Sequence, residues 1–142
     1  MDILLVEDSR DDVLTFEYAL KETGQTARLR TVSNGGEALA FIFGKNGSFE
    51  GTPVARPRLV VLDLQLPGVN GMEVLQRLKA NRLTRNIPIV LLSSSAARRD
   101  LAAAYELGVN SYLVKPTNFD EFALMVRALV QYWLHFNQPL KL

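Results

Sequence analysis

The sequence predicts an α/β fold in which helices cover both faces of a doubly wound, five-stranded parallel sheet. Short all-apolar runs, such as residues 59–62, lack period-2 alternation, which is typical of strands buried on both faces. A segment with helical spacing of apolar residues follows each run, so a strand-helix unit occurs five times without a linker or low-complexity segment. Right-handed crossovers then place helices on both sides of the sheet.

The first strand-helix unit carries acidic residues where the strand ends. The strand covers residues 3–6 and leads into Glu7 and Asp8. Ser9 is a suitable N-cap for the next helix, and acidic side chains in its first turn favour the positive end of the helix dipole. Gly24 is predicted to end this helix.

The second unit is shorter. Basic residues at alternate positions predict a strand at a sheet edge over residues 28–32. Residues 33–36 form a predicted turn, and residues 37–43 a helix. Residues 44–57 are rich in Gly, Pro and Asn, which indicates a solvated loop.

The third and fourth strands also end in polar side chains. The strand at residues 59–62 leads directly into Asp63, and a helix is predicted over residues 71–81. The strand at residues 89–92 leads into Ser93. Open α/β sheets place their chemistry at the carboxyl edge of the strands, where Asp63 and Ser93 are expected to lie.

The last part of the chain completes the pattern. An Ala-rich helix is predicted over residues 97–107, and a short strand over residues 112–114 that leads into Lys115. A long final helix is expected over residues 119–136, followed by a short tail.

Composition bounds the function. A length of 142 residues with 48% hydrophobic and 22% charged residues predicts one globular domain over residues 1–142. A net charge of +1 gives no reason to expect nucleic-acid or membrane binding. The chain has no cysteine, which excludes disulfides and thiol chemistry, and no signal peptide is apparent. A cytoplasmic location is therefore expected.

The polar strand ends form one predicted cluster. Glu7, Asp8, Asp63, Ser93 and Lys115 should converge, because parallel strands share one carboxyl edge. Carboxylates that repel one another need a cation among them, and Mg²⁺ with oxygen ligands fits this need. An Asp carboxylate is also a nucleophile that forms aspartyl phosphate, so the cluster suits phosphoryl transfer onto a carboxylate.

At this point the sequence resembles the receiver domain of two-component response regulators, over about residues 2–130. The resemblance rests on an ordered set of motifs: Glu7-Asp8, Asp63, Leu66-Pro67-Gly68, Gly71, Ser93 and Lys115-Pro116. It implies a flavodoxin-like fold with strand order 2-1-3-4-5 and five helices.

The resemblance implies the roles of the acidic residues. Asp63 would be the phosphoacceptor. Asp8 and Asp63, with Glu7 acting through water, would hold Mg²⁺, and the backbone carbonyl of Gln65 would be a further metal ligand. The family's variation at the acidic pair includes the Glu found here at position 7.

The resemblance also implies how the phosphoryl group is bound and sensed. Ser93 and Lys115 would bind its oxygens, and Tyr112 matches the family's switch aromatic. Phosphorylation is expected to draw the Ser93 hydroxyl inward and to turn Tyr112 from an exposed to a buried position. The Lys115-Pro116 bond matches one that is often cis in the family.

The predicted function is that of a stand-alone response regulator. It would accept phosphate from a sensor histidine kinase, hydrolyse its own aspartyl phosphate without being a dedicated enzyme, and signal through protein contacts. The sequence also resembles the stand-alone regulators of bacterial phytochrome-type kinases. This likeness rests on residues 7–12, on the long loop before Asp63 and on the Tyr132-Trp133 tail.

Several alternatives stay open. They are a phosphorelay intermediate, a non-catalytic interaction module and a flavodoxin-like ligand-binding module. A phosphatase of the haloacid dehalogenase type is disfavoured, because Gln65 stands where that family needs a second Asp.

A homodimer is predicted on the face formed by the fourth helix, the fifth strand and the last helix. The last helix carries apolar and aromatic residues beyond those needed to face the sheet, and such surplus usually marks an interface. Residues 119–142 are therefore expected at the interface. The alternative is that the tail, through Leu140 and Leu142, covers the patch. The predicted interface residues are Leu101, Tyr105, Met125, Ala128, Tyr132 and Phe136.

Overall fold

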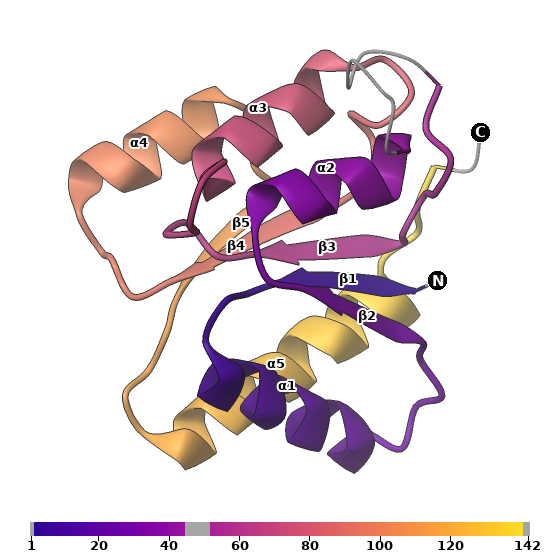
Figure 1. The fold of residues 1–142 in the computed structure, drawn as a ribbon. Coiled ribbons are helices and arrows are strands. Elements are labelled where there is room, and N and C mark those ends of the chain that lie inside the picture. The colour runs from indigo at the N-terminus through magenta and orange to yellow at the C-terminus, as the bar shows by residue number, and fades with distance from the viewer. Residues whose placement is uncertain (1, 45–51, 141–142) are drawn as a thin grey trace.

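The computed structural model describes residues 2–44 and 52–140, which form the predicted five-stranded parallel sheet with strand order β2-β1-β3-β4-β5. Helices α2, α3 and α4 cover one face, and α1 and α5 cover the other (Figure 1). The strands are β1 (Ile3–Val6), β2 (Leu29–Val32), β3 (Leu59–Leu62), β4 (Ile89–Ser93) and β5 (Ser111–Val114). The helices are α1 (Arg10–Glu22), α2 (Gly35–Phe43), α3 (Gly71–Ala80), α4 (Arg98–Glu106), α5 (Phe119–Gln131) and a π-helix, η1 (Tyr132–Phe136).

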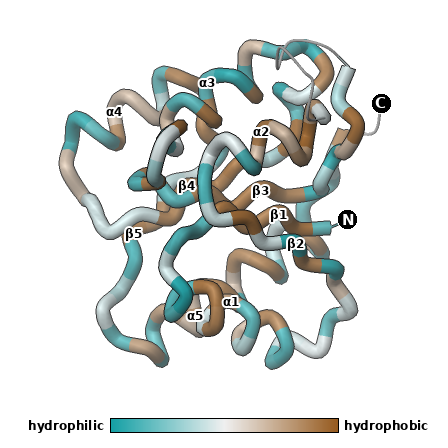
Figure 2. The backbone as a smooth tube through the Cα atoms, viewed as in Figure 1, coloured by the Kyte–Doolittle hydropathy of each residue, from teal (hydrophilic) through white to brown (hydrophobic). Residues whose placement is uncertain are grey.

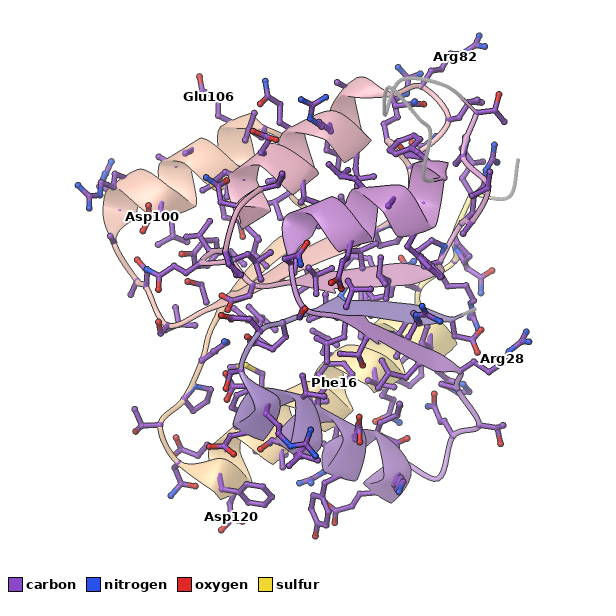
Figure 3. The ribbon with its side chains drawn as sticks, in the orientation of Figure 1. Phe16, Arg28, Arg82, Asp100, Glu106 and Asp120 are labelled. Atoms are coloured by element: carbon purple, nitrogen blue, oxygen red, sulfur yellow. The ribbon has the colours of Figure 1, made fainter. Side chains whose placement is uncertain are left out.

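Alternate residues of each central strand supply two separate apolar cores. In β1, Leu4 and Val6 pack with α2, α3 and α4, whereas Ile3 and Leu5 pack with α1 and α5. Burial on both sides explains why these strands are apolar throughout, as the hydropathy in Figure 2 illustrates. Phe16 on α1 points into the core between α1, α5 and the sheet, while the charged Arg28, Glu106 and Asp120 point outward (Figure 3).

Strand register brings the polar strand ends together. Val6 pairs with Leu62 in the β1–β3 ladder, so Glu7 and Asp63 both follow directly after paired residues. The Asp63 N–H donates to the Val6 carbonyl over 3.0 Å, and the Lys115 N–H donates to the Ser93 carbonyl over 2.7 Å. These backbone bonds extend the ladders one residue beyond the strands and fix the directions of the side chains that follow.

Four of the five α-helices in the described residues begin with the same kind of cap. A side-chain oxygen at the N-cap accepts the backbone N–H of the third helical residue, which is acidic in each case. This arrangement satisfies one otherwise unpaired N–H and places negative charge at the positive end of the helix dipole. The capping residues are Ser9, Asn34, Asn70 and Asn118.

The glycine that begins α3 lets this helix pack against the chain next to Asp63. A β-carbon at Gly71 would overlap the Asp63 carbonyl oxygen and lie 2.8 Å from the Leu64 α-carbon. The Gly71 N–H also donates to the Leu64 carbonyl over 3.1 Å. Only glycine fits this approach, so Gly71 fixes the backbone from which the Asp63 side chain projects.

The structure differs from the sequence prediction by more than one residue at two helix ends. Asn34 is the cap of α2, so this helix begins at Gly35, inside the predicted turn. The predicted helix over residues 119–136 is α-helical only to Gln131 and continues as a π-helix, in which the Asn137 N–H donates to the Tyr132 carbonyl over 2.7 Å. Apolar spacing over a single turn does not distinguish the two helix types.

Two further features bear on the predictions. All peptide bonds of the described residues are trans, including Lys115–Pro116, in contrast to the cis form that the family resemblance suggested. In the part of the chain that the structure describes, no helix combines the length and the apolar character needed to cross a membrane.

Candidate phosphorylation and metal site

Three of the predicted acidic side chains meet at the carboxyl edge of the sheet. One carboxylate oxygen from each of Glu7, Asp8 and Asp63 lies within 4.8 Å of the other two. Glu7 and Asp63 are buried, whereas Asp8 is exposed. Grouped carboxylate oxygens that are partly open to solvent are the donors that a hard divalent cation such as Mg²⁺ uses with its remaining waters. The residues therefore fit the predicted metal.

Gln65 lies in the loop after β3, where its N–H donates to Asp63 Oδ1 over 3.2 Å. This bond orients the Asp63 carboxylate relative to the loop backbone. The proposed role of the Gln65 carbonyl as a metal ligand stays a prediction.

Lys115 holds the carboxylates together. Its Nζ donates to Glu7 Oε1 over 2.7 Å and to Asp12 Oδ2 over 2.8 Å, and lies 3.4 Å from Asp63 Oδ2. The side chain of Lys115 is only 12% exposed, so these contacts replace most of the water that an ammonium group would otherwise bind. The prediction that Lys115 converges with the strand-end acids is thus met in the geometry, with Asp12 added to the set.

Burial and charge shift two pKa values in the site. The pKa of Glu7 is raised from 4.5 to about 7. Burial is the largest cause, the hydrogen bond from Lys115 opposes it, and the nearby Asp63 adds to the rise. Burial alone would lower the pKa of Lys115, but the hydrogen bonds to Asp12 and Glu7 outweigh it and raise that pKa. Lys115 is therefore a permanent cation, whereas Glu7 changes charge near neutral pH.

Ser93 and Tyr112 are linked through Ser95. Ser93 is fully buried at the end of β4, and its Oγ accepts the Ser95 N–H over 3.1 Å. The Tyr112 hydroxyl donates to the Ser95 carbonyl over 2.8 Å, and its ring belongs to the core under α4. The structure thus has Tyr112 in the buried position that was expected only after phosphorylation.

Asp12 is the site residue that the sequence analysis missed. It was assigned only to the first turn of α1, as an acid that favours the helix dipole. Its position four residues after Asp8 was the available signal, because side chains of a helix point back toward its N-terminus. An acid at this position therefore reaches the strand-end cluster.

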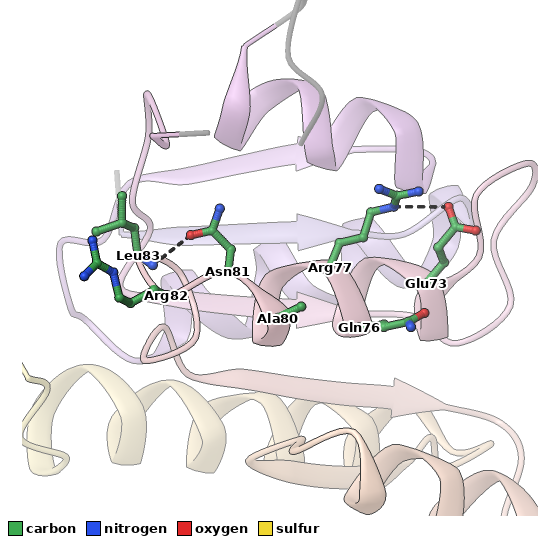
Figure 4. Close-up of a pocket in the computed structure, with 7 residues that line it drawn as sticks. All are labelled: Glu73, Gln76, Arg77, Ala80, Asn81, Arg82 and Leu83. Carbon is green, nitrogen blue, oxygen red and sulfur yellow. Dashed lines mark hydrogen bonds and ion pairs between the residues drawn. The ribbon is translucent and has the colours of Figure 1, made fainter. Parts of the chain in front are cut away.

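One surface hollow borders this site, and a larger hollow lies elsewhere on the molecule. A small hollow of about 300 Å³ is lined by Glu7, Asp8 and Arg10 at the carboxyl edge. A hollow of about 650 Å³ lies along α3 and the turn after it, where Arg77 pairs with Glu73 over 3.6 Å (Figure 4). Glu7 and Asp8 line the smaller hollow, and none of the predicted site residues lines the larger one.

The fold and the acidic edge define a class of signalling module, and comparison with known proteins identifies it. The family model for the response regulator receiver domain matches residues 3–127. The chain therefore belongs to the response regulator receiver family, whose members act in phosphorylation-based signalling with sensor histidine kinases.

Two relatives match this chain over most of its length. The chain is 39% identical to response regulator Rcp1 of Synechocystis over 132 residues, covering 93% of this chain and 88% of that protein. It is 38% identical over 136 residues to the probable methanogenesis regulatory protein FilR2 of Methanothrix harundinacea, covering 96% of this chain and 85% of that protein.

Two solved structures agree in fold along almost the whole chain. The phosphorylated cyanobacterial phytochrome response regulator RcpA superimposes with a TM-score of 0.89 at 31% identity, covering 99% and 98% of the two chains. The Mn²⁺-bound form of Rcp1 superimposes with a TM-score of 0.86 at 37% identity, covering 98% of each. This protein is thus a receiver-domain response regulator close to phytochrome response regulators.

Glu7 predicts a pH dependence of stability in the metal-free protein. The pKa of Glu7 is about 7 in the folded protein, whereas the unfolded chain has the ordinary value of 4.5. Between these two pH values the folded chain therefore binds more protons than the unfolded chain. Stability should then fall as pH rises from about 4.5 to about 7, by up to about 1.4 kcal/mol for each pH unit. Urea unfolding across this range measures the slope.

A Glu7→Gln variant provides the reference, because glutamine does not titrate. The wild type should lose stability relative to this variant as pH rises through the window. Parallel curves for the two proteins would contradict the burial-raised pKa of Glu7.

Proposed function

We propose that this receiver accepts a phosphoryl group on Asp63 from the phosphohistidine of a sensor histidine kinase, in a Mg²⁺-dependent reaction. One observation carries the proposal most strongly. The Asp63 carboxylate lies at the end of the central strand β3, within 4.8 Å of the Glu7 and Asp8 carboxylates and 3.4 Å from the Lys115 ammonium. An acid nucleophile flanked by anionic ligands and a fixed cation suits phosphoryl transfer.

The reaction would exchange one bond to phosphorus for another. An Asp63 oxygen forms the new P–O bond while the P–N bond to the donor histidine breaks, and the imidazole nitrogen keeps the electron pair. The product carries more negative charge than the carboxylate did. Lys115, a permanent cation, would offset part of that charge by binding a phosphoryl oxygen, and the Ser93 hydroxyl would donate to another.

The metal would be held by Asp8 and Asp63, by Glu7 through water, and by the Gln65 carbonyl. When bound, Mg²⁺ neutralises charge on the reacting oxygens and on the ligands themselves. The three grouped carboxylates support this ligand set, as does the existence of a Mn²⁺-bound form of the relative Rcp1.

Tyr112 would report the phosphorylated state. Its hydroxyl bond to the Ser95 carbonyl is two residues from Ser93, whose hydroxyl would move toward the phosphoryl group. We infer an equilibrium in which the buried Tyr112 ring is the position that phosphorylation favours, and an exposed ring the alternative.

The kinase partner in this proposal is a phytochrome-type sensor, as the similarity to Rcp1 and RcpA supports. The receiver would hydrolyse its own aspartyl phosphate without acting as a dedicated enzyme. A cytoplasmic location, the lack of nucleic-acid and membrane contacts, and the phosphorelay and interaction-module alternatives stay predictions.

The direct test uses a small phosphodonor such as acetyl phosphate. Wild-type protein should gain one phosphoryl group by intact mass in Mg²⁺, and none in excess chelator. The Asp63→Asn variant keeps the shape but lacks the nucleophile and should gain none. Stable phosphorylation of that variant at the wild-type level would refute Asp63 as the acceptor.

Two controls sharpen this test. The Asp8→Ala variant should remain folded, because the change removes a carboxylate that repels its neighbours. It should lose Mg²⁺ binding, because the same carboxylate is a proposed metal ligand. Phosphotransfer from a panel of purified kinases tests the partner, and a strong preference for a kinase of another type would exclude the phytochrome assignment.

We also propose a homodimer that uses the outer face of α5 and η1. Leu124, Tyr132 and Phe136 are 60%, 51% and 62% exposed, and with Ala128 they repeat every four residues along one stripe. Such an apolar stripe is costly in water and fits a second copy related by a two-fold axis. The described part of the tail, up to Leu140, leaves this stripe exposed; Leu142 lies outside the described residues.

The predicted interface residues differ in how they support this dimer. Tyr105 on α4 is 54% exposed, but α4 covers the opposite face of the sheet from α5 (Figure 1). Leu101 and Met125 are half-buried and pack against the two cores, so they offer less surface than predicted. Leu124, which is 60% exposed, adds to the apolar surface of the last helix.

Sedimentation at micromolar concentration tests the dimer. The wild type should sediment as a dimer, and Tyr132→Asp should sediment as a monomer, because it places a charge in the stripe. Tyr18→Asp on α1 is the matched control, since Tyr18 is 50% exposed and lies outside the stripe. A wild-type monomer, with or without a phosphate analogue, would contradict the dimer.

A further inference from the structure

Asp12 is bonded to Lys115 and has no part in the roles proposed so far. Its Oδ2 lies 2.8 Å from Lys115 Nζ, close to the 2.7 Å of the Glu7 bond and shorter than the 3.4 Å to Asp63. Charge-assisted bonds between nitrogen and oxygen are about 2.7–2.9 Å long. The Lys115 ammonium is therefore bonded fully to Glu7 and Asp12 and only loosely to Asp63.

The donors of Lys115 are already shared among three carboxylates. An ammonium group has three N–H donors and no more. The bond to Asp63 is the loosest of the three, so a phosphoryl oxygen on Asp63 can take over that donor. Drawing Nζ from 3.4 Å to a close distance then lengthens the bond to Glu7 or the bond to Asp12. The question is which of these two carboxylates yields.

Burial decides between the two close partners. The Glu7 side chain is 2% exposed, and its second oxygen already accepts the Ser9 N–H over 3.1 Å. The Asp12 side chain is 27% exposed, so water can replace the ammonium there. Removing a partner from a buried charge costs far more than removing one from a charge that water can reach. Asp12 is the partner that is exchanged at the lower cost.

We propose that Asp12 is a positioning residue, which holds the Lys115 ammonium in the unphosphorylated receiver and competes for it with the phosphoryl group on Asp63. The proposal rests on the proposed function of Asp63. Asp12 is in the first turn of α1 and Lys115 directly follows β5, so the exchange also releases the start of α1 from that strand end. Phosphorylation would thereby be felt on α1 as well as at Tyr112.

Binding of fluoroberyllate, a phosphoryl analogue, in saturating Mg²⁺ tests the competition at equilibrium. The Asp12→Asn variant keeps the side-chain shape but no longer holds the ammonium as an ion pair. It should bind fluoroberyllate about 3- to 10-fold more tightly than the wild type, as expected from the loss of one competing hydrogen bond. Backbone amide shifts of the first turn of α1 should change on binding in the wild type and much less in the variant.

Asp11→Asn is the matched control, because Asp11 is in the same helical turn, is exposed, and changes the net charge equally. Its affinity for fluoroberyllate should equal that of the wild type. The Lys115→Met background isolates the route of the effect. Binding will be weaker there, and changing Asp12 to Asn should leave it unaltered, because the residue competed for is gone.

The outcomes separate this proposal from the proposed function. Tighter binding by Asp12→Asn alone, abolished in the Lys115→Met background, supports the competition. Equal or weaker binding by Asp12→Asn overturns it while leaving Asp63 as acceptor. An equal gain in Asp11→Asn also overturns it, since general charge would explain the effect. Failure of the wild type to bind fluoroberyllate would refute the proposed function itself.

Discussion

The ammonium group of Lys115 is the interaction on which the carboxyl edge of this receiver depends. It lies 2.7 Å from Glu7, 2.8 Å from Asp12 and 3.4 Å from Asp63, and it joins β5 to β1, α1 and β3. With Asp8 nearby, four acidic side chains are gathered around one fixed cation. Such a set carries more negative than positive charge, which favours both the binding of a divalent cation and the protonation of one of the acids.

The fold supplies this condition through its parallel topology. Parallel strands end at the same edge, so residues that are far apart in sequence meet there. Gly71 brings α3 directly against the Asp63 backbone, and the ladder bond from Asp63 to Val6 holds it beside Glu7. Each apolar core lies under one face, so the polar edge is built on rigid elements. The backbone of a site held this way needs little reorganisation when charge develops on Asp63.

Much of this arrangement could be predicted from the sequence because it is carried by strand ends. A short apolar run that leads directly into Asp63 or Lys115 predicts both the strand and the sheet edge at which the side chain lies. Asp12 could not be placed in the same way, since helix caps with acidic neighbours are common and its contact depends on the orientation of α1 relative to β5. The π-helix at Tyr132 and the buried Tyr112 ring depend on tertiary packing, which apolar spacing leaves undetermined.

The stability of metal-free protein at pH 8 tests the central role of Lys115 most directly. At this pH Glu7 is ionised, so Lys115→Met should lower the unfolding free energy by about 3 kcal/mol, and Mg²⁺ should restore part of the loss. Lys79→Met is the control, because among the residues that the structure describes Lys79 Nζ bonds the neutral oxygens of Arg85, Ile87 and Asn110. The stability lost in this variant should therefore not respond to Mg²⁺. If Lys115→Met unfolds at the same urea concentration as the wild type, or at a higher one, the acidic edge does not depend on this cation.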